Sequence, residues 1–327
     1  PPSPSCEPMP PRISETAYED LLTIRDWLRY GVSQFRTAGL AFGHGTTTAQ
    51  DEAAFLILST LRLPIDDLAP WLDARLTRDE RGRVGEMLDR RIVTRKPASY
   101  LTGEAWIQGH RFRVDERVIV PRSYIGELLA SDGLAPVVGN GHGLKRILDL
   151  GTGSGCLAIL AALAYPEAAV DAVDVSMDAL TVASRNVADY GLAERIRLLQ
   201  SDLFAAIPGD RYDLIIANPP YVSAAAVQAF PPEYRAEPVL AHLGGQDGLD
   251  IVRRILDNAS KHLTTGGKLV VEVGTGGRAL AAERPDLEFL WLDTAESEGE
   301  VFALEMPSTP KPAPAARKRG RKAGTKE

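Results

Sequence analysis

The chain has 327 residues, of which 44% are hydrophobic and 25% charged, a composition typical of a globular protein with room for two domains. No apolar run approaches the roughly 18 residues that a membrane span requires, and the Pro-rich start lacks the layout of a secretory signal, so a cytoplasmic protein is expected. The net charge of −7 is unevenly distributed, because residues 307–327 carry seven Lys or Arg and a single Glu.

The two ends, residues 1–15 and 307–327, have the composition of disordered segments. A Lys/Arg-rich tail is attracted to polyanions, so one interpretation is a weak contact with RNA or a ribosome, and the other is a solvated tail without a specific partner. Two cysteines and five scattered histidines offer neither a disulfide framework nor the spacing of metal ligands. No metal is therefore expected.

The first elements that the pattern predicts are helices. Thr16 followed by Glu19 has the form of a capping box, and apolar residues at helical spacing continue from there to Phe35. Further helices are predicted at 50–61 and 77–91. Together they indicate a small helical domain over residues 16–92, and the alternating pattern of residues 93–124 indicates a hairpin and an extended connector.

From Arg146 onward strands and helices alternate. Strands are predicted at 147–150, 170–173, 196–199, 212–217, 268–273, 289–292 and 301–304, with helices at 156–165, 177–190 and 249–263 between them. This alternation predicts an α/β fold in which a doubly wound, seven-stranded, mostly parallel sheet carries helices on both faces.

The segment ILDLGTGSGC joins the first strand of this sheet to a helix. Gly151, Gly153 and Gly155 let the chain turn sharply and let a ligand approach the backbone. Asp174 ends the next strand, about 20 residues further on, where a carboxylate can accept hydrogen bonds from ribose hydroxyls. Dinucleotide oxidoreductases share this logic, but their fingerprint is GxGxxG, whereas the spacing here is GxGxG.

That spacing, led by Asp149, resembles the first motif of the class I S-adenosylmethionine-dependent methyltransferases. The resemblance implies S-adenosyl-L-methionine as the methyl donor, held by Asp149, Gly151, Thr152, Gly153, Gly155, Asp174, Asp202 and Leu203. It would put Asp202 and Leu203 near the adenine, whereas the plain alternative for Asp202 is a helix cap. Polar residues at the ends of four successive strands favour a ligand site along one sheet edge.

The stretch NPPY, residues 218–221, follows the fourth strand and resembles the (N/D)PPY sequence of methyltransferases that act on nitrogen attached to a planar π-system. Such a nitrogen is a poor nucleophile because its lone pair is delocalised. Acceptors at fixed positions can hold its N–H groups and stabilise the positive charge that develops. The Asn218 side-chain oxygen and the Pro219 carbonyl are the predicted catalytic acceptors, and Pro220 and Tyr221 complete the predicted substrate site. A Pro-Pro strand terminator is the alternative.

With these motifs, the segments RKPASYLTGEAW, VDERVIVPRS and EYRAEPVLAHLGGQDGLDIVRRIL resemble the HemK/PrmB family of protein-(glutamine-N(5)) methyltransferases, PrmB branch, over residues 18–306. The resemblance implies methylation of a glutamine amide in large-subunit ribosomal protein three. It also implies that residues 125–306 form the methyltransferase domain and that the helical domain recognises the substrate. Ile107 stands where an aromatic residue is expected near that glutamine, so Trp106 or another side chain takes this role, or none does.

Three other functions stay open at this point. They are a release-factor glutamine methyltransferase, an adenine-N(6) nucleic-acid methyltransferase and a non-catalytic ribosome-assembly factor. The acidic body and the absence of a basic stripe on the N-terminal helices argue against a duplex-binding face. Intact Asp149, Asp174 and Asn218 argue against a vestigial site.

Overall fold

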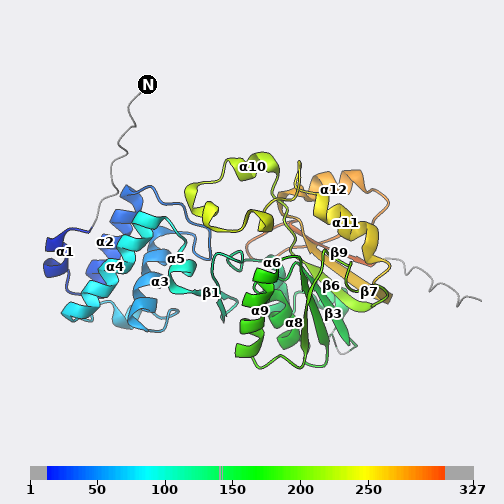
Figure 1. Ribbon diagram of the computed structural model, residues 1–327, viewed down its shortest axis with the longest axis horizontal. Helices are drawn as coiled ribbons and strands as arrows, with labels where there is room; N and C mark the ends of the chain where they lie inside the picture. Colours follow the sequence, from blue (N-terminus) through cyan, green and yellow to red (C-terminus); the bar gives the residue numbers. More distant parts are fainter. Residues whose placement is uncertain (1–12, 140, 142, 306–327) are drawn as a thin grey trace, which may run out of the picture.

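The computed structural model describes residues 13–139, 141 and 143–305 (Figure 1). The basic tail predicted at 307–327, and residues 1–12 of the N-terminus predicted to be disordered, lie outside the described residues. Ile13 is buried and α1 begins at Glu15, so the helical part of the chain begins earlier than the predicted boundary at residue 16.

The N-terminal part is helical, as predicted. Its elements are α1 (Glu15–Asp20), α2 (Ile24–Thr37), α3 (Ala49–Leu61), the 3-10 turn η1 (Ala69–Trp71), α4 (Arg78–Thr94) and α5 (Ala98–Thr102). They enclose a separate apolar core in which Trp27, Phe35 and Leu56 are fully buried. Burial of these large side chains gives the small helical unit its own hydrophobic stabilisation.

The single helix predicted from Thr16 to Phe35 is wrong, because the chain breaks between α1 and α2. Ser14, and not Thr16, caps α1, and the capping box lies further on, where Thr23 and Asp26 cap α2 reciprocally. The backbone N–H groups of Leu22 and Thr23 both donate to the Asp26 carboxylate, at 3.1 and 2.9 Å. The apolar residues keep helical spacing from Thr16 to Phe35, but the capping box at Thr23 starts a new helix within this stretch, so two helices form in place of one.

The predicted hairpin is confirmed as β1 (Glu104–Ile107) paired with β2 (His110–Arg113). The predicted seven-stranded sheet is also confirmed. Its strands are β3 (Arg146–Leu150), β4 (Ala169–Asp174), β5 (Ile196–Gln200), β6 (Tyr212–Ala217), β7 (Leu263–Glu272), β8 (Leu290–Leu292) and β9 (Val301–Glu305). The order is β5-β4-β3-β6-β7-β9-β8; neighbours from β5 to β7 pair in parallel, whereas β9 pairs antiparallel with β7 and β8.

Apolar cores lie on both faces of the sheet, because successive residues of its central strands point to opposite sides. On β6, Leu214 and Ile216 belong to one core, and Ile215 and Ala217 to the other. The remaining helices and turns are α6 (Tyr124–Ala130), α7 (Ala135–Val138), α8 (Cys156–Ala164), α9 (Met177–Asp189), α10 (Ala224–Gln228), η2 (Pro232–Ala236), η3 (Val239–Ala241), α11 (Asp250–Ala259), η4 (Gly274–Gly276) and α12 (Gly277–Glu283). Residues of α8 fill the first core and residues of α11 the second.

The segment between β6 and α11, residues 218–249, lies between the helical part and the sheet (Figure 1). Glu233 of this segment is fully buried, accepts a hydrogen bond from the Ala41 backbone N–H at 3.1 Å and pairs with Arg95 at 2.6 Å. The hydrogen bond joins positions 192 residues apart, and both contacts hold the segment against the helical part. Within the described part of the chain, no helix is long and apolar enough to cross a membrane.

Candidate active site

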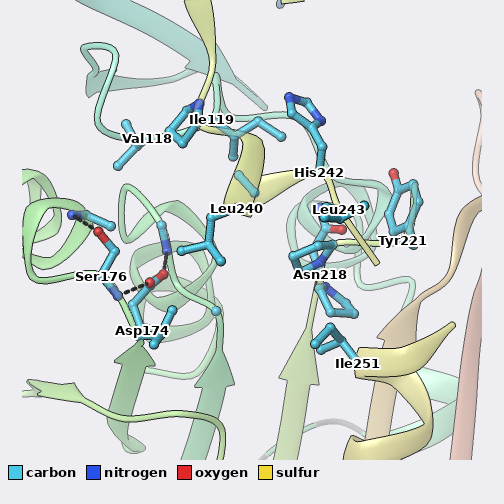
Figure 2. A pocket seen from close by; sticks show the side chains of 18 of the residues that line it. Val118, Ile119, Asp174, Ser176, Asn218, Tyr221, Leu240, His242, Leu243 and Ile251 are labelled. Atoms are coloured by element: carbon cyan, nitrogen blue, oxygen red, sulfur yellow. Dashed lines mark hydrogen bonds between the residues drawn. The ribbon is translucent and has the colours of Figure 1, made fainter. Parts of the chain in front are cut away.

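A cavity of about 540 Å³ opens at the carboxyl ends of β3, β4, β5 and β6 (Figure 2). This edge is where open α/β sheets bind their ligands. Nine of the residues predicted from sequence line it: Gly151, Gly153, Asp174, Asp202, Leu203, Asn218, Pro219, Pro220 and Tyr221. The other three, Asp149, Thr152 and Gly155, do not line it.

The loop after β3 presents bare backbone to the cavity. Gly151 and Gly153 have φ of +74° and +55°, and a β-carbon added at either would have no neighbouring atom within 4 Å. Only glycine adopts this backbone without strain, and the space beside the loop stays open to a ligand.

Asp149, Thr152 and Gly155 support that loop from within the protein. Asp149 is fully buried, and its Oδ2 accepts a hydrogen bond from the Thr152 hydroxyl at 2.6 Å. Burial raises the pKa of the Asp149 carboxyl to about 7, and its Oδ1 has no hydrogen-bond partner among the described residues. Gly155 caps α8, where an added β-carbon would lie 3.2 Å from Ala183 Cβ. The loop shape therefore depends on these residues although none lines the cavity.

Asp174 faces the cavity with a fixed carboxylate at the end of β4. Its Oδ2 accepts from the Gly153 backbone N–H and its Oδ1 from the Ser176 backbone N–H, both at 2.9 Å. Each oxygen retains lone pairs for a ligand hydroxyl. Burial raises the pKa of this carboxyl. Figure 2 shows Asp174 and Asn218 on opposite sides of Leu240.

Asp202 and Leu203 follow β5 on the same side of the cavity as Asp174. The alternative of a helix cap at Asp202 is wrong, because the chain continues in turns and no helix lies between β5 and β6. Asp202 accepts instead from Arg254 of α11 at 2.8 Å, and Leu203 adopts a left-handed backbone with φ of +51°. Leu203 and Val175 are apolar residues of the cavity lining that follow β5 and β4, respectively, on this side.

The NPPY residues offer two acceptors that the protein itself does not use. Asn218 Nδ2 donates to the Arg122 carbonyl at 3.2 Å, which leaves its Oδ1 without a donor among the described residues. The Pro219 carbonyl likewise receives no hydrogen bond from the described part of the chain. Because Pro219 and Pro220 lack N–H groups, this corner of the cavity is rich in acceptors and poor in competing donors.

Tyr221 is held beside these acceptors. Its hydroxyl donates to Glu272 Oε1 at 2.9 Å, and burial together with the Glu272 charge raises the pKa of the phenol. Its ring leans on Gly274, where a β-carbon would come within 2.7 Å of the ring. Glu272 also accepts from the Ser123 hydroxyl at 2.6 Å and the Tyr124 backbone N–H at 3.0 Å. One buried carboxylate thereby connects the NPPY loop with the segment before α6.

The Gly-rich segment after η3 braces the same loop. The Val222 backbone N–H donates to the His242 carbonyl, and the Gly244 backbone N–H donates to the Val222 carbonyl, both at 2.9 Å. A β-carbon at Gly244 would lie 2.5 Å from the Gly248 carbonyl oxygen and 2.6 Å from that of Pro220. Close approach of three backbone segments therefore requires glycine here.

Aromatic residues of the cavity wall come from a segment that the sequence pattern does not single out as a wall. Phe230, Tyr234 and His242 line the cavity, whereas neither Trp106 nor Ile107 does. Ile107 is buried beneath Gly126 in the sheet core, and Trp106 lies 38% exposed on the hairpin. Of the alternatives left open by the sequence, Trp106 is therefore the one that this position does not favour. In the sequence, Tyr234 and His242 are covered only by the family resemblance of the segment EYRAEPVLAHLGGQDGLDIVRRIL.

Comparisons with known proteins agree with this geometry. The family described as "Methyltransferase small domain" matches residues 130–230. The ribosomal protein uL3 glutamine methyltransferase of Bordetella pertussis is 56% identical over 88% of this chain and 96% of its own length. Its namesake in Burkholderia pseudomallei is 53% identical over 88% of this chain and 96% of its own. The solved catalytic domain of hMettl16 with a MAT2A 3'UTR hairpin is 17% identical, with a TM-score of 0.48, over 75% of this chain and 88% of that one.

Proposed function

The chain belongs to the family of ribosomal protein uL3 glutamine methyltransferases, and from that membership we propose that it methylates a glutamine side-chain amide in uL3. The predicted family and its PrmB branch are thereby confirmed, since the relatives carry the name of the ribosomal substrate and not that of a release factor. Because the proposed substrate is a ribosomal protein, we also propose that the enzyme acts in the cytoplasm.

We propose that S-adenosyl-L-methionine occupies the β3–β5 side of the cavity. The open backbone at Gly151 and Gly153 suits the polar end of this molecule, and the fixed Asp174 carboxylate suits ribose hydroxyls. Apolar Leu203 and Val175 of the lining suit adenine, and Asp202 precedes Leu203. When bound, this molecule supplies an electrophilic methyl group on a sulfonium whose departure as a neutral thioether drives transfer.

The glutamine amide would occupy the other side, at NPPY. Asn218 Oδ1 and the Pro219 carbonyl are two acceptors for the two N–H groups of one primary amide. Holding both N–H groups orients the nitrogen lone pair and stabilises the positive charge that develops as the new bond forms. Neither acceptor needs to act as a strong base, because the charged nitrogen can lose its proton afterwards.

The observation that carries this function is the pair of unused acceptors at the NPPY corner, opposite the Asp174 carboxylate within one cavity. A primary amide has two donors to satisfy, and this corner offers it two acceptors, where neither Pro219 nor Pro220 has an N–H group to compete. We propose that the helical domain, residues 16–92, helps to recognise the protein substrate, because the segment 218–249 that walls the cavity lies between this domain and the sheet (Figure 1).

The test is incubation of the purified protein with methyl-labelled S-adenosyl-L-methionine and, separately, uL3, a release factor and DNA, followed by mass spectrometry. We expect label on a glutamine of uL3 alone. Label on the release factor would assign the chain to the sister activity, and label on adenine would overturn the protein substrate. Absence of label on every substrate would favour a non-catalytic assembly role. The matched control is Asn218→Ala, which retains the cavity but removes one proposed acceptor.

A further inference from the structure

The orientation of the Asn218 amide is decided by one contact. Its Nδ2 donates to the Arg122 carbonyl at 3.2 Å, and this is the hydrogen bond that distinguishes the two ends of the amide. If the amide turned over, it would present a donor to the substrate in place of Oδ1. A donor at that position would repel the N–H groups of the substrate amide. The position of the Arg122 carbonyl therefore decides whether the site can hold its substrate.

Glu237 fixes the backbone that carries this carbonyl. Its Oε1 accepts from the Val120 backbone N–H at 2.9 Å and from Arg122 Nη1 at 2.7 Å, and its Oε2 accepts from Arg122 Nη2 at 2.7 Å. This carboxylate therefore holds both the side chain of Arg122 and the backbone two residues before it. A bidentate pair of this kind has a narrow range of geometries.

The carboxylate of this pair is buried and its guanidinium is partly exposed. Glu237 is 3% exposed, whereas the Arg122 side chain is 31% exposed and its guanidinium lies over the Tyr234 ring, 5.9 Å from its centroid. Burial would raise the pKa of the Glu237 carboxyl, but the hydrogen bonds and charge of Arg122, together with His242 and His44 beside the carboxyl, outweigh it and lower the pKa to about 2. The pair holds its geometry firmly, because breaking it would leave the buried Glu237 carboxylate without its partner.

The two residues that follow Arg122 in the chain are also held in place, by Glu272. Ser123 and the Tyr124 backbone N–H both bind Glu272, which also receives the Tyr221 hydroxyl. Residues on both sides of the Arg122 carbonyl are thus bound to buried carboxylates. Glu237 holds it from the segment before α11, and Glu272 holds it from the end of β7.

We propose that Glu237 and Arg122 are positioning residues for methyl transfer, which hold the Arg122 carbonyl so that Asn218 presents its oxygen to the substrate amide. The inference rests on the proposed function. Neither Glu237 nor the Arg122 guanidinium needs to touch the reacting nitrogen; the pair acts through the Asn218 amide.

Glu233 provides a matched control. It lies four residues before Glu237, is equally buried, and also binds an arginine and a backbone N–H group, but its partners are Arg95 and Ala41 of the helical part. It has no contact with residues 120–124 or 218–221 among its hydrogen bonds and ion pairs. Glu233→Gln therefore perturbs the same segment without reaching Asn218.

The experiment compares Glu237→Gln, Arg122→Lys and Glu233→Gln with the wild type, by kcat on uL3, S-adenosyl-L-methionine affinity from calorimetry and Tm. We expect kcat to fall by about 10- to 100-fold in the first two variants, the scale of a slight misplacement of a catalytic group. Cofactor affinity should stay within about threefold, and Glu233→Gln should keep kcat within about threefold of the wild type despite a lower Tm. Equal kcat losses in Glu233→Gln and Glu237→Gln would overturn the proposal in favour of a merely structural role.

A double-mutant cycle tests whether the pair acts through Asn218. In the Asn218→Ala background, Glu237→Gln should lower kcat by less than about threefold, because the group that it positions is already gone. An undiminished loss in that background would overturn the proposal. Should Glu237→Gln fail to fold, Arg122→Lys carries the same cycle.

The orientation of the Asn218 amide can also be followed by NMR without any methyl transfer, so the positioning role of Glu237 can be tested separately from the proposed function. The side-chain NH2 resonances of Asn218, assigned by their loss in Asn218→Ala, should shift in Glu237→Gln and stay in place in Glu233→Gln. Unmoved resonances in Glu237→Gln would overturn the positioning role. If the wild type fails to methylate uL3, the proposed function fails, whereas these resonances still decide whether Glu237 orients the amide.

Discussion

Gly244→Ala tests whether the Gly-rich segment fixes the NPPY loop. The added β-carbon would lie 2.5 Å from the Gly248 carbonyl oxygen and 2.6 Å from that of Pro220, and both obstacles are backbone atoms. A β-carbon essentially never approaches another heavy atom within 3.0 Å, so one or both carbonyls must move by about half an ångström or more. The Pro220 carbonyl follows directly after the proposed acceptor at Pro219.

We expect kcat on uL3 to fall about tenfold or more, because a misplacement of about 1 Å can cost about 100-fold in rate. The free energy of unfolding should fall by about 1–3 kcal/mol, the usual cost of overpacking. Affinity for S-adenosyl-L-methionine should change little, since the proposed cofactor residues Gly151, Gly153 and Asp174 lie on the other side of the cavity. Saturating kinetics, calorimetric titration and denaturant unfolding measure the three quantities.

Gly82→Ala is the matched control. Gly82 lies within α4, where an added β-carbon would have no neighbour within 4 Å. Alanine should stabilise that helix by about 0.5–1 kcal/mol and leave kcat unchanged. A wild-type kcat in Gly244→Ala, with the protein folded, would refute the claim that this segment sets the position of the loop.

Four further outcomes are expected. Asn218→Ala should lower kcat about 100-fold or more while cofactor affinity stays near normal, because it removes one acceptor beside the nitrogen that becomes positively charged. An equal loss of cofactor affinity would show that the role of Asn218 is misassigned. Gly153→Val should abolish cofactor binding as measured by calorimetry. The backbone at Gly153 has φ of +55°, which disfavours valine, and the added side chain would enter the cavity. A normal titration would show that the cofactor binds elsewhere. Arg91→Ala should lower the free energy of unfolding, measured in urea, by about 3–5 kcal/mol. In the wild type the buried Glu52 carboxylate lies 2.5 Å from Arg91, and the substitution leaves it without this partner. A loss below about 1 kcal/mol would contradict this reasoning. Because its pKa is lowered to about 2, the Glu237 carboxylate should contribute on the order of 3 kcal/mol to the free energy of unfolding. This contribution is complete above about pH 4.5 and is lost as the pH falls toward 2. Between these pH values, the slope of unfolding free energy against pH should therefore be shallower in Glu237→Gln than in the wild type.

Local properties of the chain were enough to predict the seven strands and the two chemical motifs. Apolar period and turn residues placed the seven strands to within a few residues of their ends, apart from the longer start of β7. The glycines of the first loop and the prolines of NPPY restrict their own backbone, so their positions could be interpreted without tertiary contacts. Parallel strands then bring Asp174 and Asn218 to one edge of the sheet.

Local pattern failed where a competing signal or a distant partner decided the outcome. The period from Thr16 to Phe35 is helical throughout, but Thr23 starts a new helix and pairs with Arg75 in an isolated bridge. The resemblance predicts that Asp149 binds the cofactor, and the sequence did not show that Asp149 is buried and bound to the Thr152 hydroxyl.

The groups that hold the NPPY corner in place come from distant parts of the chain, and their contacts are seen only in the folded protein. Glu237 binds Arg122 across 115 residues of sequence, and Glu272 binds Tyr221 across 51. The sequence does not show which partner a carboxylate will bind, because the attraction between two charges is weak in water and becomes strong only where burial excludes water. Folding brings these side chains together in a dry interior, and that is where the orientation of Asn218 is set.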